Sequence, residues 1–128
     1  MTKLIRSTAL LAIVALAATS AIAQPPPFEA EVDCDGIFSP GNTVPILLEL
    51  TNQTDAPISI SVRVAVDIPL RGEHTLLERS ANLPPNRTRN HRRNLVLPQG
   101  APNGEYTILM TADSDTTMTF DTCSFHVQ

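Results

Sequence analysis

The sequence of 128 residues contains no tryptophan, and only one tyrosine and four phenylalanines supply aromatic rings. Proteins that stack sugars or nucleobases on exposed rings need more of them, so these ligand classes lose support. Cations are also scarce. Beyond residue 23 there is no lysine, and seven arginines face thirteen acidic residues, which gives a formal charge of −6. General nucleic-acid binding requires a basic surface, so we expect no nucleic-acid partner.

The sequence also has no apolar run long enough to span a membrane. The longest run, Ala9 to Ala18, would rise only about 15 Å as a helix, whereas the hydrocarbon core is roughly 30 Å thick. This run follows Lys3 and Arg6, and the small residues of Ala21-Ile22-Ala23 suit a signal peptidase. We therefore interpret residues 1–23 as an export signal cleaved after Ala23. The mature protein is expected to be periplasmic or secreted, with no membrane span after cleavage.

Cysteine is limited to two residues, Cys34 and Cys123, and both lie beyond the export signal. They do not form the Cys-x-x-Cys spacing that is typical of redox proteins. In an oxidising compartment, two cysteines in one small domain most simply form a disulfide, which is the pairing we predict. A metal or redox role for the two thiols is the alternative.

No helical periodicity is found beyond residue 23, and a period of two dominates instead. In the segment 58–68, six aliphatic residues from Ile58 to Ile68 alternate with mostly polar ones, as in a strand with one buried face. A lead-in of polyproline II type is expected over residues 24–27. Further strands are expected at 28–34, 44–50, 73–79, 106–112 and 118–127, and another strand is expected to end at Leu97. In the last strand the apolar residues change from even to odd positions after Phe120, which predicts a bulge near Asp121-Thr122. About seven antiparallel strands over residues 28–128 indicate an all-β, immunoglobulin-like β-sandwich.

Two segments strengthen this interpretation: Ser39-Pro40-Gly41-Asn42-Thr43-Val44 before the second strand, and Ala101-Pro102-Asn103-Gly104-Glu105-Tyr106 at the sixth. The chain resembles the immunoglobulin-like or fibronectin-III-like domains of secreted bacterial proteins. The resemblance implies that Tyr106 is a corner residue whose hydroxyl ties down the preceding loop. The antibody pattern differs, because there is no core tryptophan and the cysteines fall in the first and last strands. Such a resemblance predicts a fold and leaves the function open.

The most unusual polar feature is a basic run at residues 87–94, which contains Arg87, Arg89, His91, Arg92 and Arg93. Arginine's planar guanidinium suits carboxylate and phosphate groups, so the run is a candidate site for an unknown protein or an anionic component of the cell envelope. No apolar residue precedes position 95 in this run, so it must project from the core or form an exposed edge. Two other interpretations remain open. The charges could discourage edge-to-edge pairing of strands, or they could balance the acidic residues at 29–35.

Other polar groups give weaker indications. Met110, Met118 and His126 could be imagined as copper ligands, although methionines at such positions are usually core residues. Asp113, Asp115 and the nearby Asp121 could hold calcium, or they could belong to a solvated turn. Asn52 and Asn86 begin Asn-x-Thr glycosylation sequences, which we expect to be bare in a bacterial protein.

No nucleophile, base and orienting group emerge as a set, so we expect neither an enzyme nor a cofactor nor a metal site. The function predicted from the sequence is that of an exported soluble domain acting through contacts with another macromolecule. The alternatives are a secreted protease inhibitor that presents a loop and a periplasmic metal-binding sandwich protein.

Overall fold

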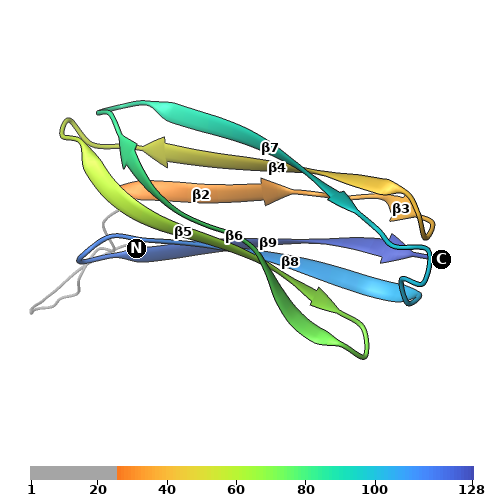
Figure 1. Cartoon of the computed structure of the whole chain (residues 1–128). Coiled ribbons are helices and arrows are strands. Elements are labelled where there is room, and N and C mark those ends of the chain that lie inside the picture. The colour runs from red at the N-terminus through yellow and green to blue at the C-terminus, as the bar shows by residue number, and fades with distance from the viewer. Residues whose placement is uncertain (1–25) are drawn as a thin grey trace, which may run out of the picture.

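The computed structural model describes residues 26–128, which form a sandwich of two β-sheets (Figure 1). A three-stranded sheet has the order β2-β4-β7, and a five-stranded sheet has the order β3-β9-β8-β5-β6. The predicted all-β sandwich is confirmed, while the predicted export signal lies outside the described residues. The strands are β2 (Phe28–Asp33), β3 (Ile37–Phe38), β4 (Thr43–Asn52), β5 (Ile58–Ile68), β6 (Gly72–Leu83), β7 (Thr88–Val96), β8 (Gly104–Asp113) and β9 (Met118–Val127).

Residues 26–128 contain eight strands rather than about seven, because the short β3 was not anticipated. β3 pairs parallel with β9, through Ile37 with His126 and Phe38 with Val127, whereas every other strand pair is antiparallel. β3 has only two residues, one exposed and one partly buried, so it is too short for an alternating apolar pattern to predict it. β6 is longer than expected, since it continues to Leu83.

β5 has the bounds that its alternation predicts, and it lies between β6 and β8. Its inward side chains Ile60, Val62, Val64 and Val66 are all buried. They pack in the core against inward side chains of the opposite sheet and of β8 and β9, which include Phe28, Val44, Ile46, Ile108, Met110 and Phe125. The core therefore sits between the two sheets and is built from the period-two pattern of each strand.

The bulge predicted near Asp121 is wrong, because β9 pairs with β8 in one uninterrupted register. The apolar side chains of Met118 and Phe120 lie on the outer face, where they are 64% and 67% exposed. Asp121 faces inward instead, and its Oδ2 accepts a hydrogen bond from the N–H of Val32 in β2 at 2.9 Å. This carboxylate satisfies a backbone donor at the edge of β2, which explains a polar residue at an inward position. The register shift lies elsewhere, between β5 and β6 at Val64/Ala65.

Pro45 is tolerated inside β4 because its position needs no backbone donor. The N–H of Gln53 donates to Pro27 at 2.8 Å, so odd-numbered residues of β4 bond toward β2. β2 ends at Asp33, which pairs with Leu47, so Pro45 lies past the end of its partner. This bond also places Pro27, in the expected lead-in, against the first ladder.

Candidate functional site

One side of the sandwich, between β2 and β9, is closed by a covalent bond. Cys34 and Cys123 form a disulfide with Cα atoms 5.8 Å apart, across 89 residues of sequence. The predicted pairing is confirmed. The hydrogen bond from Val32 to Asp121 lies close to it along the same two strands. This side of the molecule is therefore tied together by a covalent bond and a hydrogen bond, and a groove of about 320 Å³ lies between β2 and β9 beside Glu29, Glu31 and Phe120.

Tyr106 is a buried residue of β8 that holds the loop before it. Its hydroxyl donates a hydrogen bond to the carbonyl oxygen of Pro102 at 2.8 Å, and its ring packs on Phe125 with centroids 5.1 Å apart. Burial raises the pKa of Tyr106 above its usual value of 10.0, while Arg71 acts in the opposite sense. This is the bond that a corner tyrosine makes, and it gives Tyr106 a structural role.

The opposite side of the sandwich is open. β6 and β7 are the outermost strands of the two sheets, and each lacks a neighbour on one side. Figure 1 shows the two strands leaving a common turn and diverging along their length. Residues of both strands line one groove, so their unpaired edges border the same side of the molecule.

β7 carries the basic run, and the structure divides the run between two faces. Arg89, His91 and Arg93 pair with Leu50, Leu48 and Ile46, whose side chains face the core. Since paired residues point to the same side of a sheet, these three basic side chains occupy the face that would be apolar in a closed sandwich. Arg92 pairs with Leu47 and points to the outer face. Arg87 lies before β7, in the turn from β6.

All five basic residues of the run are exposed, and among the residues of β7 only the partly buried Leu95 packs against the core. A groove of about 220 Å³ lies between β7 and β6. The floor of this groove is apolar and includes Leu50, Leu77 and Met110. Its rim is basic and includes Arg79, Arg89 and His91, and no acidic residue lines the groove. The arrangement suits an elongated anion with some apolar surface.

Arg79 is a functional candidate that the sequence interpretation missed. It lies in β6 opposite Val62, and therefore on the inward face with Leu77 and Leu83. The signal was present in the sequence, because Leu77, Ala81 and Leu83 follow a period of two that includes position 79. An arginine in an otherwise apolar register marks a face that is not fully covered.

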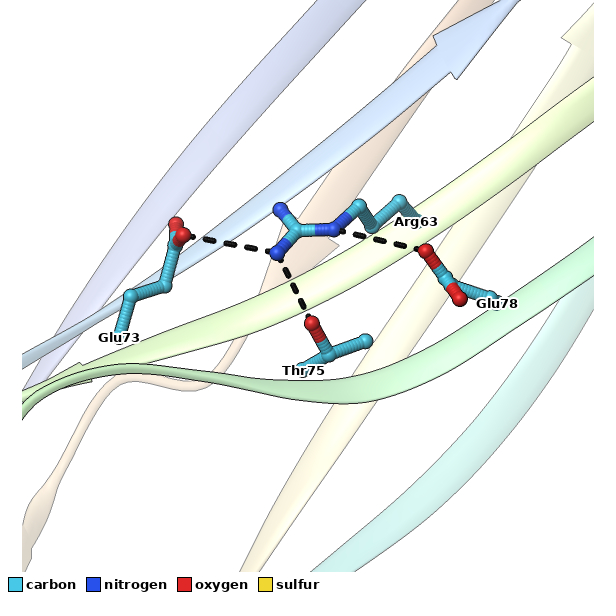
Figure 2. A network of polar contacts seen from close by, with 4 residues as sticks. All are labelled: Arg63, Glu73, Thr75 and Glu78. Carbon is cyan, nitrogen blue, oxygen red and sulfur yellow. Dashed lines mark hydrogen bonds and ion pairs between the residues drawn. The ribbon is translucent and has the colours of Figure 1, made fainter.

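The arginines of β7 differ from Arg63 in β5, which is neutralised within the molecule (Figure 2). Arg63 donates to the Thr75 hydroxyl at 2.8 Å, and it lies 3.5 Å from the carboxylate of Glu73 and 3.7 Å from that of Glu78. These are the two ion pairs found within residues 26–128. The basic run on β7 makes none in the described part of the chain, and β4 separates it from the acidic residues of β2. Intramolecular ion pairing therefore does not account for the run.

The outer face of the three-stranded sheet carries the opposite charge. Glu31 of β2 is paired directly with Glu49 of β4, and Glu29 and Asp121 lie nearby. A hydrogen bond to Glu49 and repulsion from its charge raise the pKa of Glu31 above the usual 4.5, with smaller effects of desolvation, Asp121 and Glu29. Charge thus changes from acidic over β2 and β4 to basic at β7, within one sheet.

Replacing Glu49→Gln is expected to lower the pKa of Glu31, because the like charge is removed and the amide can donate to the carboxylate. A raised pKa in the folded state means that the protonated pair favours folding at low pH, and that this advantage is lost as the pH rises through the folded pKa. The variant should therefore gain stability over wild type at pH 7 and little at pH 3. NMR titration of the carboxyl carbons and urea unfolding at both pH values measure this.

The control for this prediction is Asp115→Asn, which removes the same charge from the exposed turn between β8 and β9. If both variants change the Glu31 titration and the stability alike, the effect comes from net charge and not from the Glu31–Glu49 pair.

The residues considered as metal ligands are not brought together. Met110 is buried in the core, while Met118 is exposed on the outer face of β9. Met118 and His126 lie at opposite ends of β9, because Met118 pairs with Asp113 whereas His126 pairs with Glu105. Within residues 26–128, no group of three or more histidine, cysteine or acidic side chains is placed to hold a metal ion. The same residues contain no helix with the length and hydropathy of a membrane span.

The most exposed apolar side chain of the turns is Leu70, between β5 and β6, which is fully exposed. Its φ of 69° lies in the left-handed region, so this turn is not an extended strand-like loop. The N–H of Arg71 closes the turn by donating to Ile68 at 3.0 Å. This is the geometry of a tight hairpin turn, and it does not favour the presentation of an extended loop to a protease.

Comparison with known proteins shows similarity of fold and not of sequence. No protein family model matches the chain, and no curated protein matches its sequence. Among solved structures, the CARDB domain of a Pyrococcus furiosus protein, in complex with di-metal ions, superimposes with a TM-score of 0.65. It is 17% identical, and the match covers 78% of this chain and 91% of that one.

Parts of two larger enzymes have the same fold. An alkylpurine DNA glycosylase from Pseudomonas fluorescens, bound to DNA containing an abasic site analog, matches with a TM-score of 0.64 at 11% identity, over 80% of this chain and 30% of that one. A β-glucosidase from Listeria innocua, in complex with glucose, matches with a TM-score of 0.62 at 11% identity, over 78% and 16%. Since such different proteins contain this sandwich, the comparisons identify an immunoglobulin-like or fibronectin-III-like fold and leave the function to the site.

Proposed function

We propose that this protein is an exported, non-catalytic binding module whose strand β7 contacts an acidic macromolecular partner. The observation that carries the proposal is that the cations of β7 are exposed on an edge strand and make no ion pair within residues 26–128. Arginines left with water on a protein that is otherwise acidic are available for carboxylate or phosphate groups. The disulfide supports an oxidising, exported location.

Charge asymmetry supports oriented binding. Beyond residue 23 the formal charge is −6, yet four arginines and a histidine lie between Arg87 and Arg93. A local positive field on an acidic protein attracts an anionic partner to one side and repels it from the rest. Screening over about 8 Å at physiological ionic strength leaves mainly close contacts, so binding should weaken steeply as salt increases.

The triple replacement Arg89→Ser, Arg92→Ser and Arg93→Ser tests this proposal. Binding to immobilised polyglutamate at low salt should weaken by about tenfold or more, because three close charge contacts are lost. The fold should be preserved, since exposed substitutions usually change stability by less than about 0.5 kcal/mol each. Biolayer interferometry measures the binding, and urea unfolding checks the fold.

A matched comparison of single variants removes the effect of net charge. Arg92→Ser takes one cation from β7, and Arg71→Ser takes one from the β5–β6 turn. Only the first should weaken binding. Equal binding by wild type and the triple variant at low salt would show that the run only keeps the edge of β7 solvated and unpaired.

A further inference from the structure

We propose that the partner of β7 is an extended acidic segment of a protein, which adds as an antiparallel strand to the free edge of β7 and lies along the groove toward β6. This inference rests on the proposed function and names the class of partner and its mode of binding. Three features carry it: the direction of the backbone groups of β7, the spacing of its cations, and the groove beside it.

The backbone groups of β7 alternate in direction. At the two ends of the β4–β7 ladder, Asn52 N–H donates to Arg87 at 2.9 Å and Leu97 N–H donates to Asn42 at 2.9 Å. In an antiparallel pair every second residue bonds to the partner, so the odd-numbered residues from 87 to 97 bond toward β4. The even-numbered residues of β7 therefore direct their N–H and C=O groups to the side where it has no neighbour; these are Thr88, Asn90, Arg92, Asn94 and Val96.

A polypeptide can satisfy this free edge, because an extended chain offers donors and acceptors at the same repeat. A strand that bonds to Asn90 and Arg92 places its intervening residues opposite Arg89, His91 and Arg93. These are non-hydrogen-bonded pairs, in which the side chains of an antiparallel ladder are closest. Acidic residues at every second position would thus meet Arg89, His91 and Arg93 on one face, and opposite charges in the two pairs with arginine are stabilising.

The groove between β7 and β6 also suits an acidic extended segment. Arg79 of β6 adds a fourth basic side chain to its rim, and no carboxylate lines it. Glutamate can extend its methylene groups over the apolar floor at Leu50 and Leu77 while its carboxylate reaches the arginines. A second copy of this chain is a poor occupant through β7, because pairing two β7 strands would bring arginines opposite arginines.

The probe for this mode is an acetylated and amidated decapeptide that alternates threonine and glutamate. When the glutamates face Arg89, His91 and Arg93, the threonine N–H groups bond to β7 and the glutamate N–H groups point away. Methylation of the threonine nitrogens should weaken binding about tenfold or more, because several backbone bonds are lost and their acceptors on β7 remain. Methylation of the glutamate nitrogens, with the same charge and number of methyl groups, should change it little.

Hydrogen exchange of the protein gives an independent measurement. Addition of the parent decapeptide should slow exchange at the amides of Asn90, Arg92 and Asn94, which become bonded. The amides of Arg89 and His91, which already bond to β4, should change little. A peptide held only by side-chain charges would not produce this alternation.

The inference and the proposed function can fail separately. If both methylated peptides bind as tightly as the parent, and the triple serine variant loses binding, the arginines act as charges only and strand addition is wrong. If the decapeptide fails to bind while polyglutamate or phosphatidylglycerol vesicles do, strand addition is again wrong. If no anionic probe binds, both proposals are wrong.

Discussion

Replacing Cys34→Ala and Cys123→Ala together is expected to lower the free energy of unfolding by roughly 4–5 kcal/mol. The disulfide spans 89 residues of sequence, and cross-links that close long loops remove the most entropy from the unfolded state. A small domain is typically stable by about 5–15 kcal/mol, so the variant should be marginally folded. Urea unfolding followed by circular dichroism measures the loss.

The wild-type protein supplies the control, because reduction with dithiothreitol breaks the same bond without changing the sequence. Reduced wild type and the double alanine variant should unfold at similar urea concentrations, both well below oxidised wild type. Equal midpoints for oxidised and reduced wild type would show that hydrogen bonding and packing alone hold β2 against β9.

Replacing Asn52→Ala is expected to cost about 3 kcal/mol, although an asparagine at the end of a strand looks replaceable in the sequence. Its side chain is 1% exposed. The amide nitrogen donates to the carbonyl oxygens of Ala56 at 2.8 Å and of Leu83 and Pro84 at 3.1 Å. Its Oδ1 accepts from the backbone N–H and the hydroxyl of Thr54. The alanine variant leaves the carbonyl oxygens of Leu83 and Pro84 and the N–H of Thr54 without these partners, which is where the penalty arises.

Asn82→Ala is the matched control, since Asn82 is an exposed asparagine near the end of β6 that accepts one hydrogen bond from Ser59. This variant should lose less than about 0.5 kcal/mol of the free energy of unfolding. Similar small losses for both variants would mean that water replaces the contacts of Asn52.

The burial of Asn52 also bears on the Asn52-Gln53-Thr54 glycosylation sequence, because the nitrogen that would carry a glycan is buried and bonded in the folded protein.

The strands could be predicted wherever apolar and polar residues alternate without interruption. β5 has its predicted bounds because both of its neighbours are strands and one of its faces is core. The prediction failed in β9, where Phe120 and Asp121 exchange the faces expected from their polarity. Asp121 faces inward because it accepts from Val32, a residue 89 positions away. No local pattern carries information about a partner that distant.

The sequence by itself determined that residues 87–94 form an exposed cationic segment, because no apolar side chain there could be buried. It also predicted that the two cysteines would pair, on the expectation that the domain is exported. Only the tertiary structure decided that β7 is an edge strand, that Arg89 and Arg93 share a face which Arg92 does not, and that Arg79 of β6 joins them across a groove. The physical reason is that side-chain alternation is a local property of a strand. Which strands become neighbours, and which edge stays open, depends on packing between segments far apart in the chain.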